Sequence, residues 1–498
     1  MKRAKNLIHY YTQNYVRYLA GRGKNGGEPS TMSVWAHYKL GRYCTVVDAV
    51  DACAELNDWR TQEALAVSAS ACNQAAMMER AIEYIKASRP SNQLRRRIAQ
   101  SLAAFRPETA LELLDQVRPS VLHAALLEKN GQLEKAREVL EITRRKGPEW
   151  DSNDENGLLL RSKVLKMGAD ETLATINRYL KRFRIEEVQV SKVGDSPCPQ
   201  NFHSEQPNRH INGPLISVIM TTYNGAGHLE AAILSLLHQT YQRIELIVID
   251  DCSNDETADI IRHLQSKHSN IVYKKLPVNV GPYVAKNLGL KLANGRFVTC
   301  HDSDDWSHPF KIAKQVEPLL KNRGLVATAS RWIRLDQNGY AYARSTYPFL
   351  RLNPSSIMFR KEEVMGRTGV WDWSRTGADS EFLARLKVVF GRRRILTLDA
   401  PLAFGAHRQD SLMTARSTGM DTGAIHPDRM AYWQAWSSWH INTLANGERL
   451  KMPPLNTNRP FPVPKNLQNP QESLCNCIQW WELDSEMTVR NADGQGKA

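Results

Sequence analysis

Hydrophobic residues follow two different periodic patterns along this chain. Between residues 31 and 190 they recur every three or four positions, in stretches rich in Ala, Leu, Glu, Arg and Lys, which is the spacing of amphipathic helices. From residue 214 onward, short β-branched runs alternate with helical stretches. This second pattern predicts strands over 215–223, 244–251, 271–277 and 296–302, separated by helices over 228–239, 255–268 and 283–293.

Strands that alternate with helices indicate an α/β fold with a mostly parallel sheet covered on both faces. We therefore expect an all-α, repeat-like region followed by an α/β domain. The expected segments are a basic amphipathic helix over 1–30, a helical domain over 31–190, a linker over 191–213, the α/β domain over 214–425 and a C-terminal helix with a proline-rich tail over 426–498.

Two stretches of the expected helical domain resemble each other. WAHYKLGRYCTVVDAVDA (35–52) and HAALLEKNGQLEKAREVLEI (123–142) each predict a helix, a short turn at a glycine and a second helix. The pattern looks like a degenerate tetratricopeptide-type repeat, which stacks helical hairpins into a solenoid with a concave face for a protein partner or a long polymer. The other interpretation is an irregular helical domain that braces its neighbour.

Both ends of the chain allow two interpretations. Near the N-terminus, Tyr15 and Leu19 fall close to one helical face among several Lys and Arg residues, which suits either an anionic membrane surface or packing on the next domain. Near the C-terminus, Trp433, Trp436 and Trp439 are spaced to lie along one broad side of a helix. They suit packing against the preceding α/β domain, which we favour, or stacking on sugar rings.

Composition narrows the class of protein. The 498 residues are 42% hydrophobic and carry a net charge of +14, which suits anionic partners such as lipid head groups, nucleic acid or phosphorylated substrates. The basic residues are dispersed and no aromatic–basic RNA motif occurs, so nucleic-acid binding is not expected. No apolar run approaches a membrane span, no secretory signal is evident, and the eight cysteines include no CxxC pair. We expect a cytoplasmic protein with reduced thiols, peripheral at most on the inner face of the cell membrane.

Polar side chains collect where the predicted strands end. Tyr223 ends the first strand, Asp250 and Asp251 end the second, and the stretch HDSDDW (301–306) begins at the end of the fourth. Ligands of parallel α/β sheets bind beyond the carboxyl ends of the strands. The three carboxylates of HDSDDW repel one another, so a bound cation, a helix start or plain solvent must account for them. The chain has no GxxxxGK[ST] motif, which argues against a phosphate-binding P-loop.

Six stretches, taken in order, resemble the motifs of family 2 glycosyltransferases, which have the GT-A fold. They are LISVIMTTYN, ELIVIDDCSND, NVGPYVAKNLGL, FVTCHDSDDWSHP, RTGADSEFLARL and FGAHRQDSLMT, and the resemblance covers roughly 214–415. It implies a metal-dependent, inverting transfer of a sugar from a nucleotide sugar, most often UDP-linked in this family, to a glycan acceptor, with bacterial surface polysaccharide synthesis as the setting.

The resemblance also implies a donor site. Thr221 and Tyr223 match positions that line the nucleobase pocket, and Asp250 and Asp251 match positions that hold base and ribose. Lys286 stands where the family usually has an arginine near the diphosphate, so the charge is kept but the bidentate fork is lost.

Metal and catalytic roles follow from the same resemblance. Asp302 and Asp304 match the DxD-type motif, whose carboxylates suit Mn²⁺ or Mg²⁺ together with the donor diphosphate. His407 matches a second metal ligand or a diphosphate contact. Asp379 matches the base that takes the proton of the attacking hydroxyl, although Ala378 replaces the acid that commonly precedes it.

Acidic and histidine residues of this region can also have purely structural roles. Asp305 suits the first turn of a following helix, Asp379 suits a helix N-cap, and His407 suits a structural position in a loop. At the level of the whole protein, the competing hypothesis is a non-catalytic scaffold that binds a nucleotide sugar and recruits partners through the helical domain.

Overall fold

The computed structural model describes residues 14–22, 28–51, 58–145, 156–203, 205, 210–408, 425–455 and 458–495. The chain forms two compact units, each built from three segments. The helical unit comprises Met1–His203, Ser330–Leu352 and Asp399–Leu450, and the sheet unit comprises Ser204–Ala329, Asn353–Leu398 and Lys451–Ala498. The expected segments are continuous in sequence, whereas both units gather stretches that lie far apart along the chain.

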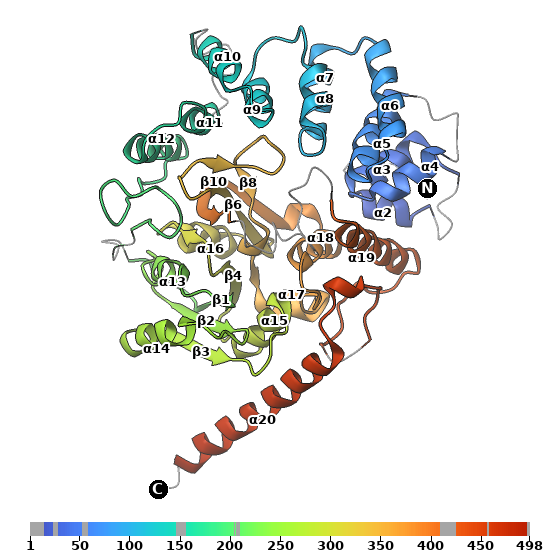
Figure 1. The fold of residues 1–498 in the computed structure, drawn as a ribbon. Helices are drawn as coiled ribbons and strands as arrows, with labels where there is room; N and C mark the ends of the chain where they lie inside the picture. The colour runs from blue at the N-terminus through green and yellow to red at the C-terminus, as the bar shows by residue number, and fades with distance from the viewer. Residues whose placement is uncertain are drawn as a thin grey trace. The chain divides into compact units, whose positions relative to one another are not determined.

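Antiparallel helical hairpins make up most of the helical unit (Figure 1). Its helices are α2 (Tyr15–Ala20), α3 (Thr31–Lys39), α4 (Tyr43–Asp51), α5 (Trp59–Ala71), α6 (Ala75–Ala87), α7 (Asn92–Leu102), α8 (Pro107–Leu113), α9 (Val121–Lys129), α10 (Leu133–Arg145), α11 (Asn156–Val164), α12 (Ala169–Arg182) and α19 (Pro427–Ala445). One apolar cluster, which includes Val34, Ile98 and Leu126, joins successive hairpins. The all-helical N-terminal region is therefore confirmed.

Two glycines form the turns of the hairpins that the sequence predicts over 35–52 and 123–142. Gly41 joins α3 to α4 with φ of +72°, and Gly131 joins α9 to α10 with φ of +74°. Left-handed backbone of this kind favours glycine because other side chains crowd the chain there. A Cβ atom on Gly41 would also lie 2.9 Å from the indole nitrogen of Trp433, so this turn has no room for a side chain.

Helix α19 packs on the N-terminal helices. The Trp433 indole donates to the Leu40 carbonyl at 2.5 Å, and Trp436 is buried with 2% exposure. Trp436 is therefore buried, while the contacts of its helix are with α2 of the N-terminal region, so packing of the tryptophans against the α/β domain stays a prediction. In α2, Tyr18 and Leu19 are both 4% exposed and belong to the core of this unit. The remainder of the predicted basic helix, 1–13 and 23–27, lies outside the described residues.

The sheet unit is built around four parallel strands, β1 (Ile216–Thr222), β2 (Ile244–Asp250), β3 (Ile271–Lys275) and β4 (Phe297–Asp302), in the order β3-β2-β1-β4. Beyond β4 the sheet continues antiparallel through β9 (Met358–Arg360) to β6 (Ala327–Leu335). Strands β6 and β10 (Ile395–Ala406) each begin in the sheet unit and end in the helical unit. The short strands are β5 (Trp306–Ser307), β7 (Ala341–Tyr342) and β8 (Arg351–Leu352).

Helices cover both faces of the parallel strands. Val218 and Met220 of β1 pack in one apolar cluster with α13 (Leu229–Leu237), α14 (Thr257–Lys267) and α16 (Lys311–Lys321). Ile219 points the other way, toward α15 (Pro282–Leu292), where a Cβ atom on Gly289 would lie 2.8 Å from it. Both faces of β1 are therefore buried, which explains why its sequence is mostly apolar and does not alternate with charged residues. The expected mostly parallel α/β fold is confirmed.

The sheet unit also contains three further helices and three short turns. It contains α17 (Lys361–Thr368), α18 (Ala378–Phe390), α20 (Gln471–Gln495) and the short 3₁₀ turns Pro354–Ser356, Arg392–Arg394 and Lys465–Leu467. Within the part of the chain that the structure describes, no helix combines the length and the apolar character needed to cross a membrane.

Candidate active site

The register of the sheet brings three predicted site residues to one edge. Thr222 of β1 pairs with Asp250 of β2, and Thr221 pairs with Asp302 of β4. Because the three strands are parallel and adjacent, their carboxyl ends meet at the same edge of the sheet. Residues separated by about eighty positions in sequence therefore become lateral neighbours.

The loops after β1 and β2 are bonded to each other. The Asp251 amide donates to the Thr222 carbonyl at 2.8 Å, and the Asn224 amide donates to Ser253 Oγ at 2.9 Å. Asn224 adopts φ of +49°, a left-handed conformation that asparagine tolerates. Between these anchors the Tyr223 ring is 53% exposed, so an aromatic face is open to solvent above a fixed loop.

Asp250 and Asp251 are both buried and already hold parts of the protein. One Asp250 oxygen accepts the Ser253 amide at 2.8 Å, and the other accepts the Tyr273 hydroxyl at 3.0 Å. The Asp251 oxygens accept the amides of Val280 and Gly281 at 2.7 and 2.8 Å. Burial raises the pKa of Asp251 to about 7, although these two amides act in the opposite direction. The pair therefore shapes the turns on either side of the site, and its direct contact with a donor stays a prediction.

Lys286 and Asp302 form the charged centre of the edge. Lys286 Nζ lies 3.1 Å from Asp302 Oδ1, and the lysine side chain is 4% exposed while the aspartate side chain is 37% exposed. Burial opposes the charge on Lys286, but the negative charge of Asp302 raises its pKa above the usual value. Burial likewise opposes ionisation of Asp302, yet Lys286 and a hydrogen bond with Ser355 hold its pKa below the usual value. Both groups are charged at neutral pH.

Tyr283 connects Asp379 to the Lys286–Asp302 pair. Asp379 is in the first turn of α18, and its carboxyl group is hydrogen-bonded to the Tyr283 hydroxyl. Burial and the negative charges of Asp379 and Asp302 raise the pKa of Tyr283 well above its usual value. Because Tyr283 and Lys286 are three residues apart on α15, they lie on the same side of that helix. Tyr283 is not among the site residues expected from the sequence, although its spacing from Lys286 within NVGPYVAKN points to it.

The N-cap interpretation of Asp379 is wrong. The N-cap of α18 is Gly377, which adopts the left-handed conformation at φ of +82°, and Asp379 is the second residue of the helix. Glycine suits this position because the backbone is left-handed there. The Asp379 side chain therefore comes from a turn whose direction the glycine sets.

Two side chains hold the segment that leads into α18. Asn287 exchanges hydrogen bonds with the backbone of Trp371, at 2.9 Å to the carbonyl and 3.1 Å from the amide. Arg375 donates to Asn279 at 2.7 Å and to Asn469 at 3.1 Å. The approach to Asp379 is thus fixed from α15 on one side and from the C-terminal segment on the other.

A buried ion pair fastens α18 itself. Arg385 binds Glu381 through two contacts, 2.8 Å from Nε and 2.9 Å from Nη2, and both side chains are fully buried. The same guanidinium donates to the carbonyl groups of Thr368 and Val370. It therefore ties the helix that carries Asp379 to the end of α17.

Behind the acidic motif lies a buried basic cluster. His301 Nε2 bonds the Asp305 carbonyl at 3.1 Å, which leaves Nδ1 to accept from Lys311 Nζ at 3.1 Å. Lys311 also donates to Ser307 at 3.1 Å, and burial lowers its pKa to about 8. His301 therefore supports the motif from inside the fold.

The helix-start interpretation of Asp305 is also wrong. Helix α16 begins only at Lys311, and Asp305 is 4% exposed. Its negative charge acts on Lys311, whose pKa it raises against the effect of burial. Asp305 therefore belongs to the buried cluster and not to the first turn of a helix.

Asp302 and Asp304 provide carboxylate oxygens that suit a metal ion held jointly by the protein and a substrate. Asp302 is partly exposed, and Asp304 is half-buried in the turn between β4 and β5. Over the described residues, no three His, Cys, Asp or Glu side chains gather closely enough to hold a metal ion by themselves. Mg²⁺ and Mn²⁺ commonly bind through one or two carboxylates and the phosphates of a substrate. The residues present fit a cation held in this shared way.

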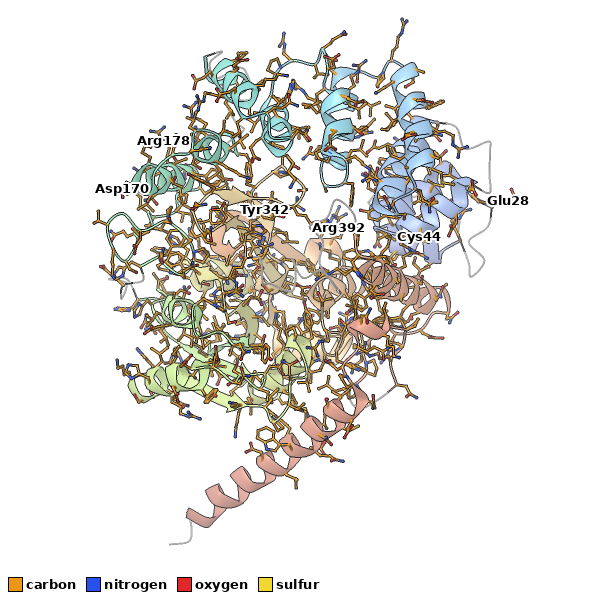
Figure 2. All side chains as sticks on the ribbon, viewed as in Figure 1. Glu28, Cys44, Asp170, Arg178, Tyr342 and Arg392 are labelled. Atoms are coloured by element: carbon orange, nitrogen blue, oxygen red, sulfur yellow. The ribbon has the colours of Figure 1, made fainter. Side chains whose placement is uncertain are left out.

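His407 lies in the helical unit, directly after β10. Its ring stacks on Tyr342, labelled in Figure 2, with ring centroids 3.5 Å apart and planes inclined by 6°. Its backbone amide donates to the Leu335 carbonyl at 2.8 Å. These contacts give the imidazole a defined support at the end of β6, and its role toward metal or diphosphate stays a prediction.

The sheet unit combines parallel strands that end in carboxylates, a lysine beside them and a separate carboxylate on a following helix. Its mixed, mostly parallel α/β sheet is of the GT-A type. Residues 217–379 match the model of glycosyl transferase family 2, and this part of the chain is a family 2 glycosyltransferase domain.

Individual proteins resemble part of the chain. An uncharacterized glycosyltransferase of Haemophilus influenzae is 42% identical over 129 residues, which are 26% of this chain and 51% of that protein. The Escherichia coli UDP-Glc:alpha-D-GlcNAc-diphosphoundecaprenol beta-1,3-glucosyltransferase WfaP is 35% identical over 122 residues, 24% of this chain and 48% of that protein. The chain thus spans about half the length of these relatives. The structure of Staphylococcus aureus TarS 1-349 aligns with 22% identity and a TM-score of 0.34, over 39% of this chain and 60% of that one.

Proposed function

We propose that this protein is a metal-dependent, inverting glycosyltransferase that moves a sugar from a UDP-sugar to a glycan acceptor. The observation that carries the proposal is the grouping of the Lys286–Asp302 pair with Asp379 through Tyr283. It supplies a place for a negatively charged leaving group and a separate carboxylate for proton removal. These are the two requirements of sugar transfer by a single displacement.

Asp379 is the proposed general base. Its carboxylate takes the proton of the acceptor hydroxyl while that oxygen forms a bond to the anomeric carbon, and the bond from this carbon to the diphosphate oxygen breaks. Attack from the face opposite the diphosphate inverts the configuration of the anomeric carbon. Tyr283 donates a hydrogen bond that orients the carboxylate, and the Glu381–Arg385 pair fixes the helix that carries it.

The donor is proposed to lie along the ends of β1, β2 and β4. Thr221 and the exposed ring of Tyr223 line the nucleobase side, with Asp250 and Asp251 shaping the pocket and contacting base and ribose. Lys286 neutralises charge near the diphosphate. Asp302 and Asp304 would hold Mn²⁺ or Mg²⁺, with His407 as a further ligand or diphosphate contact. When bound, such a cation offsets the charge that develops on the leaving nucleoside diphosphate.

The acceptor is proposed to be a growing, lipid-linked glycan of a bacterial surface polysaccharide. The support is that WfaP, by its name, acts on a diphosphoundecaprenol-linked sugar and is similar to about a quarter of this chain. A lipid-linked acceptor requires access to a membrane surface. The basic N-terminal segment and the net charge of +14 favour the anionic cytoplasmic face.

The test is nucleoside diphosphate release by an Asp379→Asn variant. We first rank UDP-, GDP-, CMP- and dTDP-sugars with and without Mn²⁺ by thermal shift, because a ligand that binds only the folded state stabilises it. With the best donor, the variant should release the nucleotide of that donor at least about 10²-fold more slowly, the range expected for loss of a general base. Asp259→Asn, an equivalent change on the exposed face of α14, should keep full turnover. Unchanged turnover in the Asp379 variant would contradict the base assignment.

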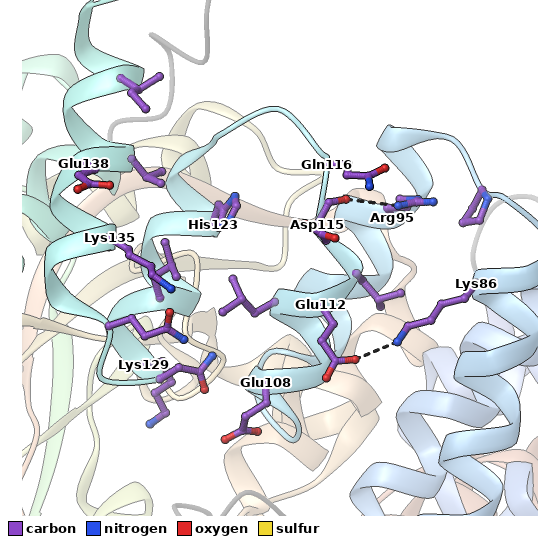
Figure 3. Close-up of a pocket in the computed structure, with 18 residues that line it drawn as sticks. Lys86, Arg95, Glu108, Glu112, Asp115, Gln116, His123, Lys129, Lys135 and Glu138 are labelled. Atoms are coloured by element: carbon purple, nitrogen blue, oxygen red, sulfur yellow. Dashed lines mark hydrogen bonds and ion pairs between the residues drawn. The ribbon is translucent and has the colours of Figure 1, made fainter.

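A scaffold function is the second candidate, and a cavity in the helical unit favours it. Figure 3 shows this cavity, about 1220 Å³ in volume, between the hairpins of α6 to α10, with the Lys86–Glu112 ion pair of 2.9 Å at one side. Lys129 and Glu138 also line it, so its surface carries both signs of charge. A scaffold predicts that donor binding stabilises the fold while no donor is turned over with any acceptor. Turnover that depends on Asp379 excludes that outcome.

A further inference from the structure

Three sulfur atoms from distant parts of the chain meet in the helical unit. Cys44 lies on α4, Cys72 caps the end of α5, and Met430 lies in the first turn of α19. The two thiol sulfurs are 3.6 Å apart, and the Met430 sulfur lies 3.5 Å from each of them. Figure 2 labels Cys44, which is on the N-terminal helices. From the sequence alone, these cysteines are expected only to be reduced thiols.

The arrangement is accessible and held from several sides. Cys44 and Cys72 are partly exposed, whereas Met430 is 7% exposed and so cannot turn away into solvent. The Cys72 amide donates to the Ser68 carbonyl at 2.9 Å, which fixes the end of α5. Asp48, one turn along α4 from Cys44, adds negative charge that acts on both thiols. A cation could therefore reach the three sulfur atoms from solvent, and the negative charge of Asp48 would partly neutralise it.

We propose that Cys44, Cys72 and Met430 form a binding site for a soft monovalent metal ion, with Cu(I) as the natural probe. A cation at the centre of this triangle would lie about 2 Å from each sulfur, so a small outward movement reaches the ~2.3 Å of a metal–thiolate bond. Thiolate and thioether ligands select Cu(I) among the biological metals. Binding deprotonates the thiols that are still protonated, so uptake of the ion releases protons to solvent.

Two other uses of these residues fit less well. Structural Zn²⁺ is held by four ligands, and no cluster of three or more His, Cys, Asp or Glu side chains exists among the described residues. A Cys44–Cys72 disulfide would need an external oxidant and would give Met430 no part. The thioether in contact with both thiols is the feature that the metal site explains and the disulfide does not.

The experiment titrates Cu(I) into the full-length chain, reduced and under anaerobic conditions, against a chromophoric Cu(I) chelator. The wild-type chain should withdraw one Cu(I) from the chelator. Cys44→Ser and Cys72→Ser should each lower the affinity at least about 100-fold, and Met430→Leu, which conserves volume, about 10-fold, the change that corresponds to ~1.4 kcal/mol. Cys475→Ser removes an exposed thiol on α20 and should change nothing.

Several results would overturn the proposal. One is that the wild-type chain withdraws no copper, and another is that Cys475→Ser lowers the affinity as much as Cys44→Ser does. Full affinity in the Met430→Leu variant would remove the thioether from the site. If the serine variants fail to fold, X-ray absorption of the loaded wild-type chain decides, because three sulfur neighbours are expected and two would contradict the site.

Discussion

Lys286 Nζ lies 3.1 Å from Asp302 Oδ1, with the ammonium buried and the carboxylate partly open to solvent. Each group supports the charge of the other, since Asp302 raises the pKa of Lys286 and Lys286 lowers that of Asp302. The lysine comes from a helix and the aspartate from the neighbouring strand end, so the fold itself assembles the pair. It presents a carboxylate that stays ionised and faces the place where a donor would lie.

Removing the lysine charge should weaken donor use. In Lys286→Met, Asp302 loses its counter-charge and the diphosphate loses a cation, so kcat/KM for the donor should fall at least about 10-fold, a loss of ~1.4 kcal/mol. Lys286→Arg keeps the charge and should stay within a few-fold of the wild-type chain. The measurement is UDP release at varied donor concentration. Equal kinetics for the methionine and arginine variants would show that charge at this position is not used.

The Tyr283 hydroxyl should act on the rate and not on donor affinity. In Tyr283→Phe, the Asp379 carboxylate loses an orienting hydrogen bond while the packing of the ring is kept, so kcat should fall by about 10-fold with KM for the donor nearly unchanged. Tyr273→Phe is the matched control, because it removes a hydroxyl that is bonded to Asp250 on the other side of the site. A larger effect on KM than on kcat in Tyr283→Phe would assign the hydroxyl to donor binding.

The buried Glu381–Arg385 pair should show non-additive stability. Arg385→Met leaves Glu381 buried without its partner, so the free energy of unfolding of the sheet unit should fall by about 3–5 kcal/mol. Glu381→Leu combined with Arg385→Met removes both charges and should be less destabilising than Arg385→Met alone. Urea unfolding of the single and double variants measures the difference. Additive losses would mean that the carbonyl contacts of Arg385, and not the ion pair, hold α18.

His37 should make the helical unit sensitive to acid. Burial, with the nearby Arg42 and Arg22, lowers the pKa of His37 to about 3 from 6.5. Between these two values the unfolded chain binds the proton and the folded chain does not, so stability is complete above pH 6.5 and falls as the pH decreases toward 3. One proton accounts for at most about 1.4 kcal/mol per pH unit.

The test compares His37→Gln with His263→Gln, a change on the exposed face of α14. Thermal unfolding between pH 7 and pH 4 should show a smaller loss of Tm in the His37 variant than in the wild-type chain. The His263 variant should follow the wild-type curve. If the His37 and wild-type chains lose stability in parallel, proton uptake by other groups governs acid unfolding.

Local patterns predicted most of the elements around the site. The strand expected over 244–251 is β2 (Ile244–Asp250), and the helix expected over 283–293 is α15 (Pro282–Leu292). Both elements are predicted by the spacing of apolar residues over a short stretch of chain, and this spacing can be taken directly from the sequence. The convergence of Asp250 and Asp302 was predictable for the same reason, because parallel strands place their carboxyl ends together.

Contacts between distant segments were not predictable in this way. Nothing near Cys44 in the sequence points to Met430, and nothing near Trp436 shows that its helix packs on α2 near the N-terminus. From the sequence, Asp305 looks like a charge at the start of a helix. Only the structure shows that its charge acts on the buried Lys311.

The sequence by itself thus determined the class of fold, the position of the acidic motif and the family of the domain, since each depends on short-range pattern. The tertiary structure decided how the chain divides into units, which tyrosine orients Asp379 and where three sulfur atoms meet. The physical reason is that burial and long-range contact depend on how complete elements pack, and a single segment carries little record of its distant neighbours.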